Sequence, residues 1–274
     1  MSKFALSSGA YRRFKLTEAV RHVALAGYDG IEVVADIPHG YPPALDKAGR
    51  DVLRTELARR KLAVSNVNAG PMTAIRDEVR PSWVEADRVL RGERVQHTLD
   101  AGELAIALGA PTVSTIGGGP TDEVAPDDAL RYFRDGLREV AQAAARDKCP
   151  PLLICPQPDL LIRSAEDVLR ILEAVGDEEV GTDLNTGHCL RADEDPAAAV
   201  RRLGPALRHV HLRDIDDDGT VVVPGTGLVD FPALFAALEE AEYDGWLTVD
   251  LSGTEVHPDD AARRALDFLK QTDW

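Results

Sequence analysis

The chain is short of cysteine, and its few cysteines form no recognisable metal clip or disulfide framework. The 274 residues include three, Cys149, Cys155 and Cys189. They contain no CxxC pair, and three irregularly spaced thiols do not build the framework of a small secreted domain. This pattern is typical of a protein from a reducing compartment.

Long apolar runs are also absent. No segment approaches the roughly 20 apolar residues of a membrane-spanning helix. The first residues, Met1-Ser-Lys-Phe-Ala-Leu6, lack the apolar stretch of a signal peptide. We therefore expect a soluble, cytoplasmic protein without a membrane partner.

Basic side chains are outnumbered by acidic ones. There are 31 Lys and Arg residues against 47 Asp and Glu residues, which gives a formal net charge of -16. Proteins that bind nucleic acid need a basic face to displace counterions from phosphates, so we expect no nucleic-acid partner. The acidity is compatible with a small neutral ligand, and equally with an adaptation to solubility or salt. It leaves open whether the chain forms a homo-oligomer.

What is present is an ordinary globular composition, with 44% hydrophobic and 28% charged residues. A chain of this length can bury one large core, and we expect a single domain over residues 1–274. Short β-rich runs alternate with longer amphipathic ones, as in a parallel sheet built from βα units. The expected strands are 4–7, 31–35, 62–68, 111–116, 152–155, 180–185, 209–212 and 246–251.

The expected helices follow these strands. They cover 15–27, a segment after Pro43, 82–108, 127–147, a segment opened by Ser164, 231–241 and 258–270. Ser164 and Asp167 have the spacing of a capping box. The acidic run 214–219 lacks the spacing and terminal Glu of an EF-hand, so we expect a hairpin turn there rather than a calcium loop.

One corner of the chain occurs twice. Leu25-Ala-Gly-Tyr-Asp-Gly-Ile-Glu-Val33 resembles Glu240-Ala-Glu-Tyr-Asp-Gly-Trp-Leu-Thr-Val249, and in each a helix ends and a buried strand begins. A βα unit about every 34 residues fits a (β/α)₈ barrel of roughly 250 residues. A doubly wound sheet would instead call for GxGxxG after the first strand, where this chain has Ser8-Gly-Ala-Tyr. We therefore predict a (β/α)₈ TIM barrel.

Polar side chains gather where the expected strands end. In a (β/α)₈ barrel these ends converge on one face. Because strand side chains alternate, Asp183 and Asn185 point to one side together, and so do His209 and His211. The side chains expected at this mouth are Asp36, His39, Asn66, Asn68, Cys155, Asp183, Asn185, His209, His211 and Asp250. His22, His97 and His257 fall in or beside outer helices and are expected to be structural.

Several of these motifs together resemble those of a known family. They are Gly27-Tyr-Asp-Gly-Ile-Glu-Val33, Thr186-Gly-His188, His209-Val-His-Leu-Arg-Asp214, Pro224-Gly-Thr-Gly227 and Tyr243-Asp-Gly-Trp-Leu-Thr-Val249. Their order and spacing are similar to those of the xylose isomerase-like TIM barrels, which include sugar isomerases, ketose epimerases and inosose dehydratases. The resemblance covers most of the chain and is strongest from residue 152 to residue 251.

The resemblance implies a divalent metal held by Glu, Asp, His and Glu from strands five to eight. The corresponding residues here are Cys155, Asn185, His211 and Asp250, so only the histidine is unchanged. A thiol in place of a carboxylate disfavours Mg²⁺ and Mn²⁺ and favours Zn²⁺. Asp250 is also one methylene shorter than Glu. The implied cofactor is Zn²⁺ or Mn²⁺ in an altered site, or none if the altered site stays empty.

The resemblance also implies roles for the side chains. Cys155 and Asp250 take the positions of the two groups that move a proton between carbons. A different reading of Cys155 is a small buried residue at a strand end. His188 takes the position of a residue that binds a substrate hydroxyl. We expect further substrate contacts from Asp36, His39, Asn68 and Arg213.

Two functions follow. The first is a sugar or polyol isomerase, epimerase or related lyase, acting at the barrel mouth with an altered metal site. The second is a non-catalytic or metal-free relative that binds a metabolite or partner. The polar mouth favours the first, and the substituted metal positions favour the second. DNA repair of the endonuclease IV type is disfavoured by the net charge, and a serine hydrolase by the absence of a GxSxG elbow.

Overall fold

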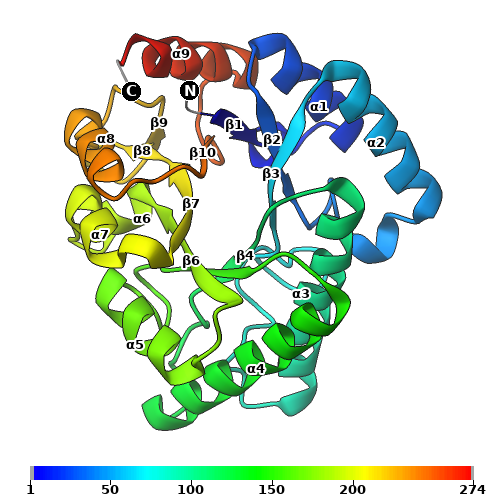
Figure 1. Cartoon of the computed structure of the whole chain (residues 1–274), viewed down its shortest axis with the longest axis vertical. Coiled ribbons are helices and arrows are strands. Elements are labelled where there is room, and N and C mark those ends of the chain that lie inside the picture. The colour runs from blue at the N-terminus through cyan, green and yellow to red at the C-terminus, as the bar shows by residue number, and fades with distance from the viewer. Residues whose placement is uncertain (1–2, 273–274) are drawn as a thin grey trace.

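Eight parallel strands close into a barrel within residues 3–272, the part of the chain that the computed structural model describes (Figure 1). Each strand pairs with its neighbours in chain order, and the last pairs with the first. This confirms the predicted (β/α)₈ fold. The barrel strands are β1 (Lys3–Ser7), β2 (Gly30–Val34), β3 (Ala63–Asn68), β4 (Val113–Ile116), β5 (Leu152–Cys155), β6 (Val180–Asn185), β7 (Leu207–Leu212) and β10 (Trp246–Val249).

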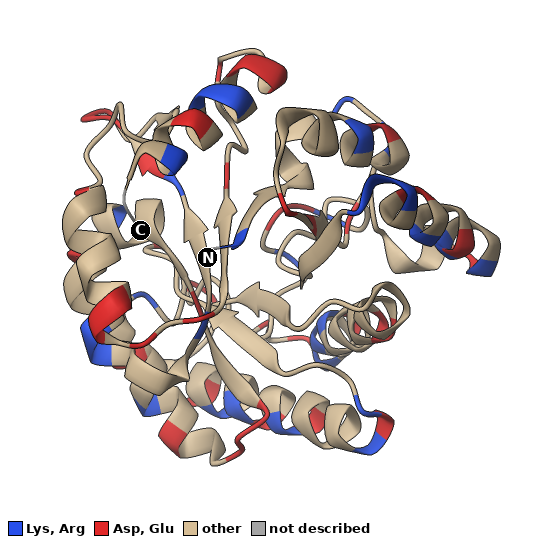
Figure 2. Ribbon diagram, turned by 45° about the horizontal axis from the view of Figure 1, so that its top comes forward, with Lys and Arg blue, Asp and Glu red and all other residues tan. Residues whose placement is uncertain are grey.

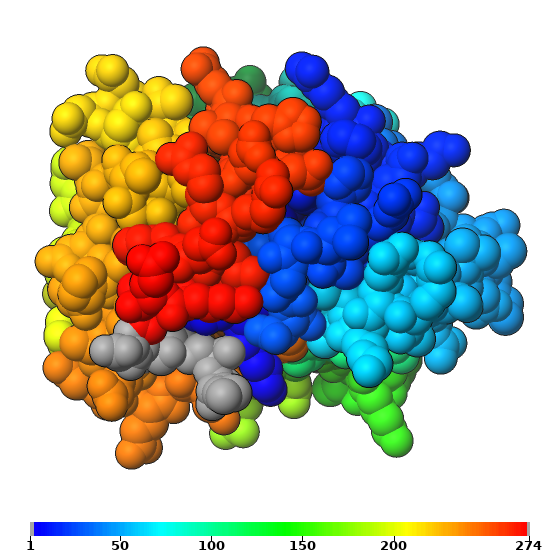
Figure 3. Space-filling view, turned by 90° about the horizontal axis from the view of Figure 1, so that it is seen from above, coloured from blue at the N-terminus to red at the C-terminus, as the bar shows by residue number. Residues whose placement is uncertain are grey.

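The helices form a ring outside the strands (Figure 1). They are α1 (Leu16–Ala26), α2 (Lys47–Arg60), α3 (Arg88–Leu108), α4 (Pro126–Asp147), α5 (Ala165–Val175), α6 (Thr186–Arg191), α7 (Pro196–Leu203), α8 (Phe231–Glu240) and α9 (Pro258–Gln271). Short 3₁₀ segments are η1 (Ser8–Tyr11), η2 (Pro42–Ala44) and η3 (Gly204–Ala206). The last helix, α9, lies beside α1, so the two ends of the chain complete one ring (Figure 3).

Helix starts follow the side chains that cap them. Ser164 accepts a hydrogen bond from the backbone N–H of Asp167, as the capping-box spacing predicted. The helix predicted to begin at Ser82 begins instead at Arg88. The reason is that Asp87 caps it by accepting from Val89 N, and the preceding turn is tied by Ser82 N donating to Glu85.

The two repeated corners end their helices in the same way, with different residues. Gly27 follows α1 with φ of 93°, and Glu242 takes up a φ of 51° after α8. The tyrosine that follows each of them is then tied down, because Tyr28 donates to Ala262 O and Tyr243 to Trp246 O. The shared Tyr-Asp-Gly therefore reflects a shared backbone turn into a barrel strand.

The acidic run after β7 is a hairpin, as expected. It joins β8 (Asp214–Ile215) to the antiparallel β9 (Val221–Val222). The buried Asp214 carboxylate accepts hydrogen bonds from the N–H groups of Gly225, Gly227 and Val229, which fixes the following loop.

Basic and acidic residues are intermixed along the outer helices (Figure 2). No helix between residues 3 and 272 is both long and apolar enough to cross a bilayer. The apolar faces of the helices pack against the outside of the barrel, where strand residues such as Leu6, Ile31 and Val210 are fully buried. The inner face of the barrel is partly polar, and Ser65 and Thr248 bond across it at 3.1 Å. This polar lining supports the site described next.

Candidate functional site

A cavity of about 350 Å³ opens at the carboxyl ends of the barrel strands. Its size lies at the small end of the range for small-molecule pockets. Six of the lining side chains come from six different strands or the residues that follow them: Glu32, Asn68, Cys155, His188, Arg213 and Asp250. This is the place where the active sites of TIM barrels lie.

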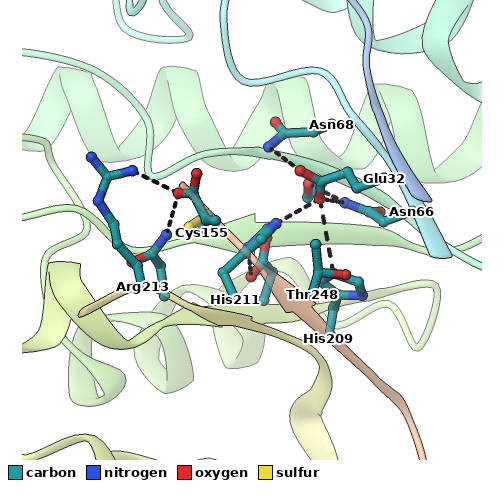
Figure 4. Close-up of polar contacts among 12 residues, drawn as sticks. Glu32, Asn66, Asn68, Cys155, His209, His211, Arg213 and Thr248 are labelled. Atoms are coloured by element: carbon teal, nitrogen blue, oxygen red, sulfur yellow. Dashed lines mark hydrogen bonds and ion pairs between the residues drawn. The ribbon is translucent and has the colours of Figure 1, made fainter. Parts of the chain in front are cut away.

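Three ionisable side chains are joined in a chain, of which Glu32 and His211 line this cavity (Figure 4). His211 Nδ1 lies 2.8 Å from Asp183 Oδ1, and His211 Nε2 lies 2.5 Å from Glu32 Oε2. All three side chains are buried. An imidazole donates from both nitrogens only when it is protonated, so two carboxylates at these distances favour the imidazolium form.

The electrostatics of this chain agree with its geometry. Burial lowers the pKa of His211, but the charges of Asp183 and Glu32 outweigh burial and raise that pKa well above its usual value. Burial likewise raises the pKa of Glu32, and the positive charge and hydrogen bond of His211 overcome it, lowering the pKa to about 2. Hydrogen bonds from Ser7, Asn66 and Asn68 also reach Glu32. Glu32 is therefore a fixed anion.

Glu32 is the site residue that the sequence reasoning missed. It lies in β2, between Ile31 and Val33, which are fully buried. An acidic residue inside a strand that is otherwise apolar was the available signal, because a buried carboxylate must be paired. The prediction selected residues at the ends of strands, and near β2 it therefore selected only those that follow the strand.

His209 lies one alternation deeper on β7 than His211. Both of its ring nitrogens are buried without a hydrogen-bond partner in the described part of the chain, and Nε2 is 3.8 Å from Glu32 Oε2. Burial, aided by the charge of His211, lowers the pKa of His209 to about 4. His209 is therefore neutral.

A second cluster lies at the wall of the cavity. Arg213 Nη1 donates to Asp250 Oδ2 at 2.7 Å, and Asn185 Nδ2 donates to the same oxygen at 3.2 Å. Burial raises the pKa of Asp250, but the charge of Arg213 prevails and holds it well below the usual range. The oxygen of the Asn185 amide accepts from Gly187 N and His188 N, so it caps α6.

Cys155 and His188 lie beside each other at the same mouth. Cys155 Sγ is 3.9 Å from His188 Nδ1. Burial, together with the charge of Asp183, raises the pKa of the Cys155 thiol well above its usual value. Burial and the charge of Arg213 lower the pKa of His188 to about 3. The pair is therefore a thiol next to a neutral imidazole.

The remaining predicted substrate contacts fall in two places. Asn68 lines the main cavity and uses its side chain on Glu32 and on Gly70 N. Asp36 and His39 line a neighbouring hollow of about 300 Å³ instead. Asp36 accepts hydrogen bonds from Thr73 and Ala74, and His39 Nε2 donates to Tyr11 O at 3.2 Å. Both side chains therefore anchor loops beside the mouth.

The family model described as xylose isomerase-like TIM barrel matches residues 20–272. The chain belongs to this family. An inosose dehydratase of Clostridium beijerinckii is 23% identical over 165 residues, covering 53% of this chain and 55% of that protein. An inosose dehydratase of Lacticaseibacillus casei is 22% identical over 281 residues, covering 93% of this chain and 89% of that protein.

Among solved structures, a crystal structure of a D-tagatose 3-epimerase-like protein superposes with a TM-score of 0.83. It is 21% identical, and the match covers 98% of this chain and 96% of that one. At this identity the likeness shows a shared fold.

The metal that the xylose isomerase-like family implies does not fit the four positions that the sequence resemblance assigns to its ligands. Cys155 offers a thiol where a hard cation needs an oxygen, and Asn185 turns an N–H group, not an oxygen, toward Asp250. Asp250 is already paired with Arg213, and both nitrogens of His211 are bonded to carboxylates. A hard divalent cation needs oxygen donors directed at one point, and these residues do not offer them.

Other side chains nearby are candidate ligand groups. Glu32, His209 and His211 bring one ligand atom each to within 4.8 Å of one another, and so do Cys155, Asp183 and His211. Both groups depend on His211, whose nitrogens already bond Asp183 and Glu32. A cation could use either group only by displacing the proton held there.

Proposed function

We propose that this chain is a sugar or polyol isomerase or epimerase that acts at the carboxyl-terminal mouth of the barrel. The observation that carries the proposal is the cavity of about 350 Å³, whose wall holds hydrogen-bonding groups from several strands. Hydroxyl-rich ligands need such a wall, because each buried hydroxyl must find a partner. The family membership and the inosose dehydratase and D-tagatose 3-epimerase-like relatives support this choice.

In this proposal, Cys155 and His188 handle the proton. His188 is neutral and can accept a proton from the carbon next to a substrate carbonyl, although its lowered pKa makes it a weak base, and the Cys155 thiol gives one to the resulting carbanion. The 3.9 Å contact between Nδ1 and Sγ then returns the proton from the imidazolium to the thiolate. Asp250 anchors Arg213 in this proposal, in place of the proton-carrying role that the resemblance implies for it. Zn²⁺ or Mn²⁺ as the cofactor stays a prediction, and the donor set argues against it.

The test follows solvent deuterium into a substrate. The chain is incubated in D₂O with D-tagatose, D-fructose or an inosose, and the carbon-bound protons are followed by NMR. We expect exchange at the carbon next to the carbonyl, and roughly a hundredfold slower exchange in Cys155→Ala, within the usual contribution of a general acid or base. Arg201→Ala, which loses only an ion pair with Glu240 on the outer ring, serves as the control. No exchange with any of these compounds would contradict an isomerase or epimerase.

A metabolite-binding protein without catalysis is the second candidate. It is favoured by one observation, that Asp250 is paired with Arg213 and therefore does not offer a free base. The same samples separate the two functions. Binding of a sugar without deuterium exchange supports the second, and exchange supports the first.

A further inference from the structure

Arg213 is held in place by contacts on both its backbone and its side chain. Its N–H donates to Thr186 Oγ1 at 2.9 Å, and its carbonyl accepts from the same hydroxyl at 2.7 Å. Its side-chain stem lies against Gly187, where an added Cβ would come within 2.9 Å of Arg213 Cγ and 3.0 Å of Cδ. Because Gly187 has no side chain, the Arg213 side chain can occupy the space beside it.

The Arg213 guanidinium is paired with Asp250, at a position where the resemblance implies a metal ligand. Asp250 Oδ2 receives Arg213 Nη1, and Asp250 Oδ1 receives Ser252 N at 3.0 Å. In the view of Figure 4, His211 reaches toward Glu32, and Arg213 lies on the other side of it. Arg213 therefore places a positive charge beside Asp250 at this mouth.

The charges at the four family positions have changed together. In the set implied by the family, three carboxylates nearly balance one doubly charged ion. Here Cys155 and Asn185 bring a thiol and an amide, and the one carboxylate, Asp250, is paired with Arg213. Losing carboxylates without losing the ion would leave a buried cation under-compensated, which is costly. Without the ion, Arg213 balances the remaining carboxylate, Asp250.

Most of the guanidinium donors have no partner among residues 3–272. The guanidinium has five N–H donors, and Nη1 to Asp250 is its one side-chain hydrogen bond in that part of the chain. The side chain lines the cavity and is 21% exposed. The planar fork of donors matches two neighbouring oxygens, such as a carbonyl and an adjacent hydroxyl, or an enediolate.

We propose that Arg213, fixed by Asp250 and Gly187, takes the place of the family's divalent cation and binds the carbonyl and adjacent hydroxyl of the ligand without a metal ion. The inference rests on the proposed function for the class of ligand. It goes further by assigning the cationic group, and it makes the protein metal-independent.

The first experiment measures the ion and the ligand separately. Protein purified without added metal is analysed for bound metals by mass spectrometry and titrated with MnCl₂ and ZnCl₂ by calorimetry. D-Tagatose, D-fructose and an inosose are then titrated with and without EDTA. We expect no stoichiometric ion and the same ligand affinity in both conditions. One Mn²⁺ or Zn²⁺ per chain, with ligand binding that EDTA abolishes and the ion restores, would overturn the inference.

Two variants locate such an ion if it is found. Binding lost in Asp250→Asn would place the ion at the mouth, and binding lost in His209→Ala would place it among Glu32, His209 and His211. Either result overturns metal independence while leaving the proposed sugar function intact. The converse failure is distinct, because a chain that binds none of the three compounds contradicts the proposed function, and the ligand role of Arg213 falls with it.

The second experiment tests Arg213 itself. Arg213→Gln keeps a polar side chain of similar length and removes the charge. We expect it to weaken ligand binding by roughly tenfold to hundredfold, the range for a lost charged hydrogen bond, and Mn²⁺ should not restore the affinity. Arg213→Lys should recover part of the loss, and Arg201→Ala should bind as the unchanged chain does. Circular dichroism confirms folding of each variant, and unchanged affinity in folded Arg213→Gln would refute the assignment.

Discussion

Glu32 and His211 are 179 positions apart in the sequence, yet Oε2 of one lies 2.5 Å from Nε2 of the other inside the barrel. The contact joins β2 to β7, which are not neighbours in the sheet. Because Asp183 holds the other nitrogen of His211, the three side chains form a buried chain of charges that stabilises the floor of the cavity.

Glu32→Gln is expected to destabilise the fold. It removes the charge that faces the His211 imidazolium, and breaking a buried pair by removing one partner costs about 3–5 kcal/mol. Urea unfolding should show a lower midpoint with an unchanged slope. Glu240→Gln is the matched control, because Glu240 pairs with Arg201 at the exposed surface, where such pairs contribute about 0–1 kcal/mol. Equal effects of the two substitutions would mean that the Glu32 contact contributes little.

Gly187→Ala is expected to displace Arg213. The new methyl group would meet the Arg213 stem at 2.9 Å, so the side chain must move away from this position. Ligand affinity should fall, and a misplacement of about 1 Å at a reacting centre can cost about a hundredfold in rate. The control is Gly92→Ala in α3, where an added Cβ meets nothing within 4 Å. That substitution should leave binding unchanged and raise helix stability by about 0.5–1 kcal/mol. A crystal structure of Gly187→Ala with Arg213 still on Asp250 would contradict this account.

The fold should lose stability in mild acid partly through His97. Burial and the charge of Arg94 lower the pKa of His97 to about 4, whereas in the unfolded chain it is about 6.5. Between these values the unfolded chain binds the proton and the folded chain does not, so the free energy of unfolding decreases as the pH falls from 6.5 to 4. Removing this one group should recover up to about 3 kcal/mol across that interval.

His97→Gln tests this by urea unfolding at a series of pH values. The variant should show a shallower fall in stability over the same interval, and the exposed His257→Gln should follow the unchanged chain. A parallel pH profile for His97→Gln and the unchanged chain would show that His97 is protonated in the fold.

The three cysteines should differ in reactivity toward a thiol reagent such as DTNB. Cys155 and Cys189 are buried, and burial raises the pKa of both thiols, so little thiolate is present or accessible. Cys149 is partly exposed and should react first. At pH 8 we expect one thiol to react in the folded chain and all three in urea. Cys149→Ser should abolish the folded-state reaction, and a fast reaction that survives this substitution would contradict the buried state of the other two.

Local patterns were enough for much of the fold. Strand ends such as Asn68, Cys155 and Asn185 were placed correctly, because a period of two and the turn residues that bound a run depend on near neighbours in the chain. The spacing of Ser164 and Asp167 likewise predicted the start of α5. The predicted start of α3 was wrong, because it depends on which of several polar residues near Ser82 caps the helix.

The sequence by itself determined the barrel and many of the polar residues at its mouth, but not Glu32. Tertiary structure alone decided what those residues do there. In the folded chain Asp36 accepts a hydrogen bond from Thr73, and Glu32 pairs with His211. Arg213 packs along Gly187 and pairs with Asp250. Such pairings join side chains from distant parts of the chain, and their geometry depends on strand register, side-chain length and burial together. No local spacing encodes that combination, which is why the ion pair of Arg213 and Asp250 appears only in the folded molecule.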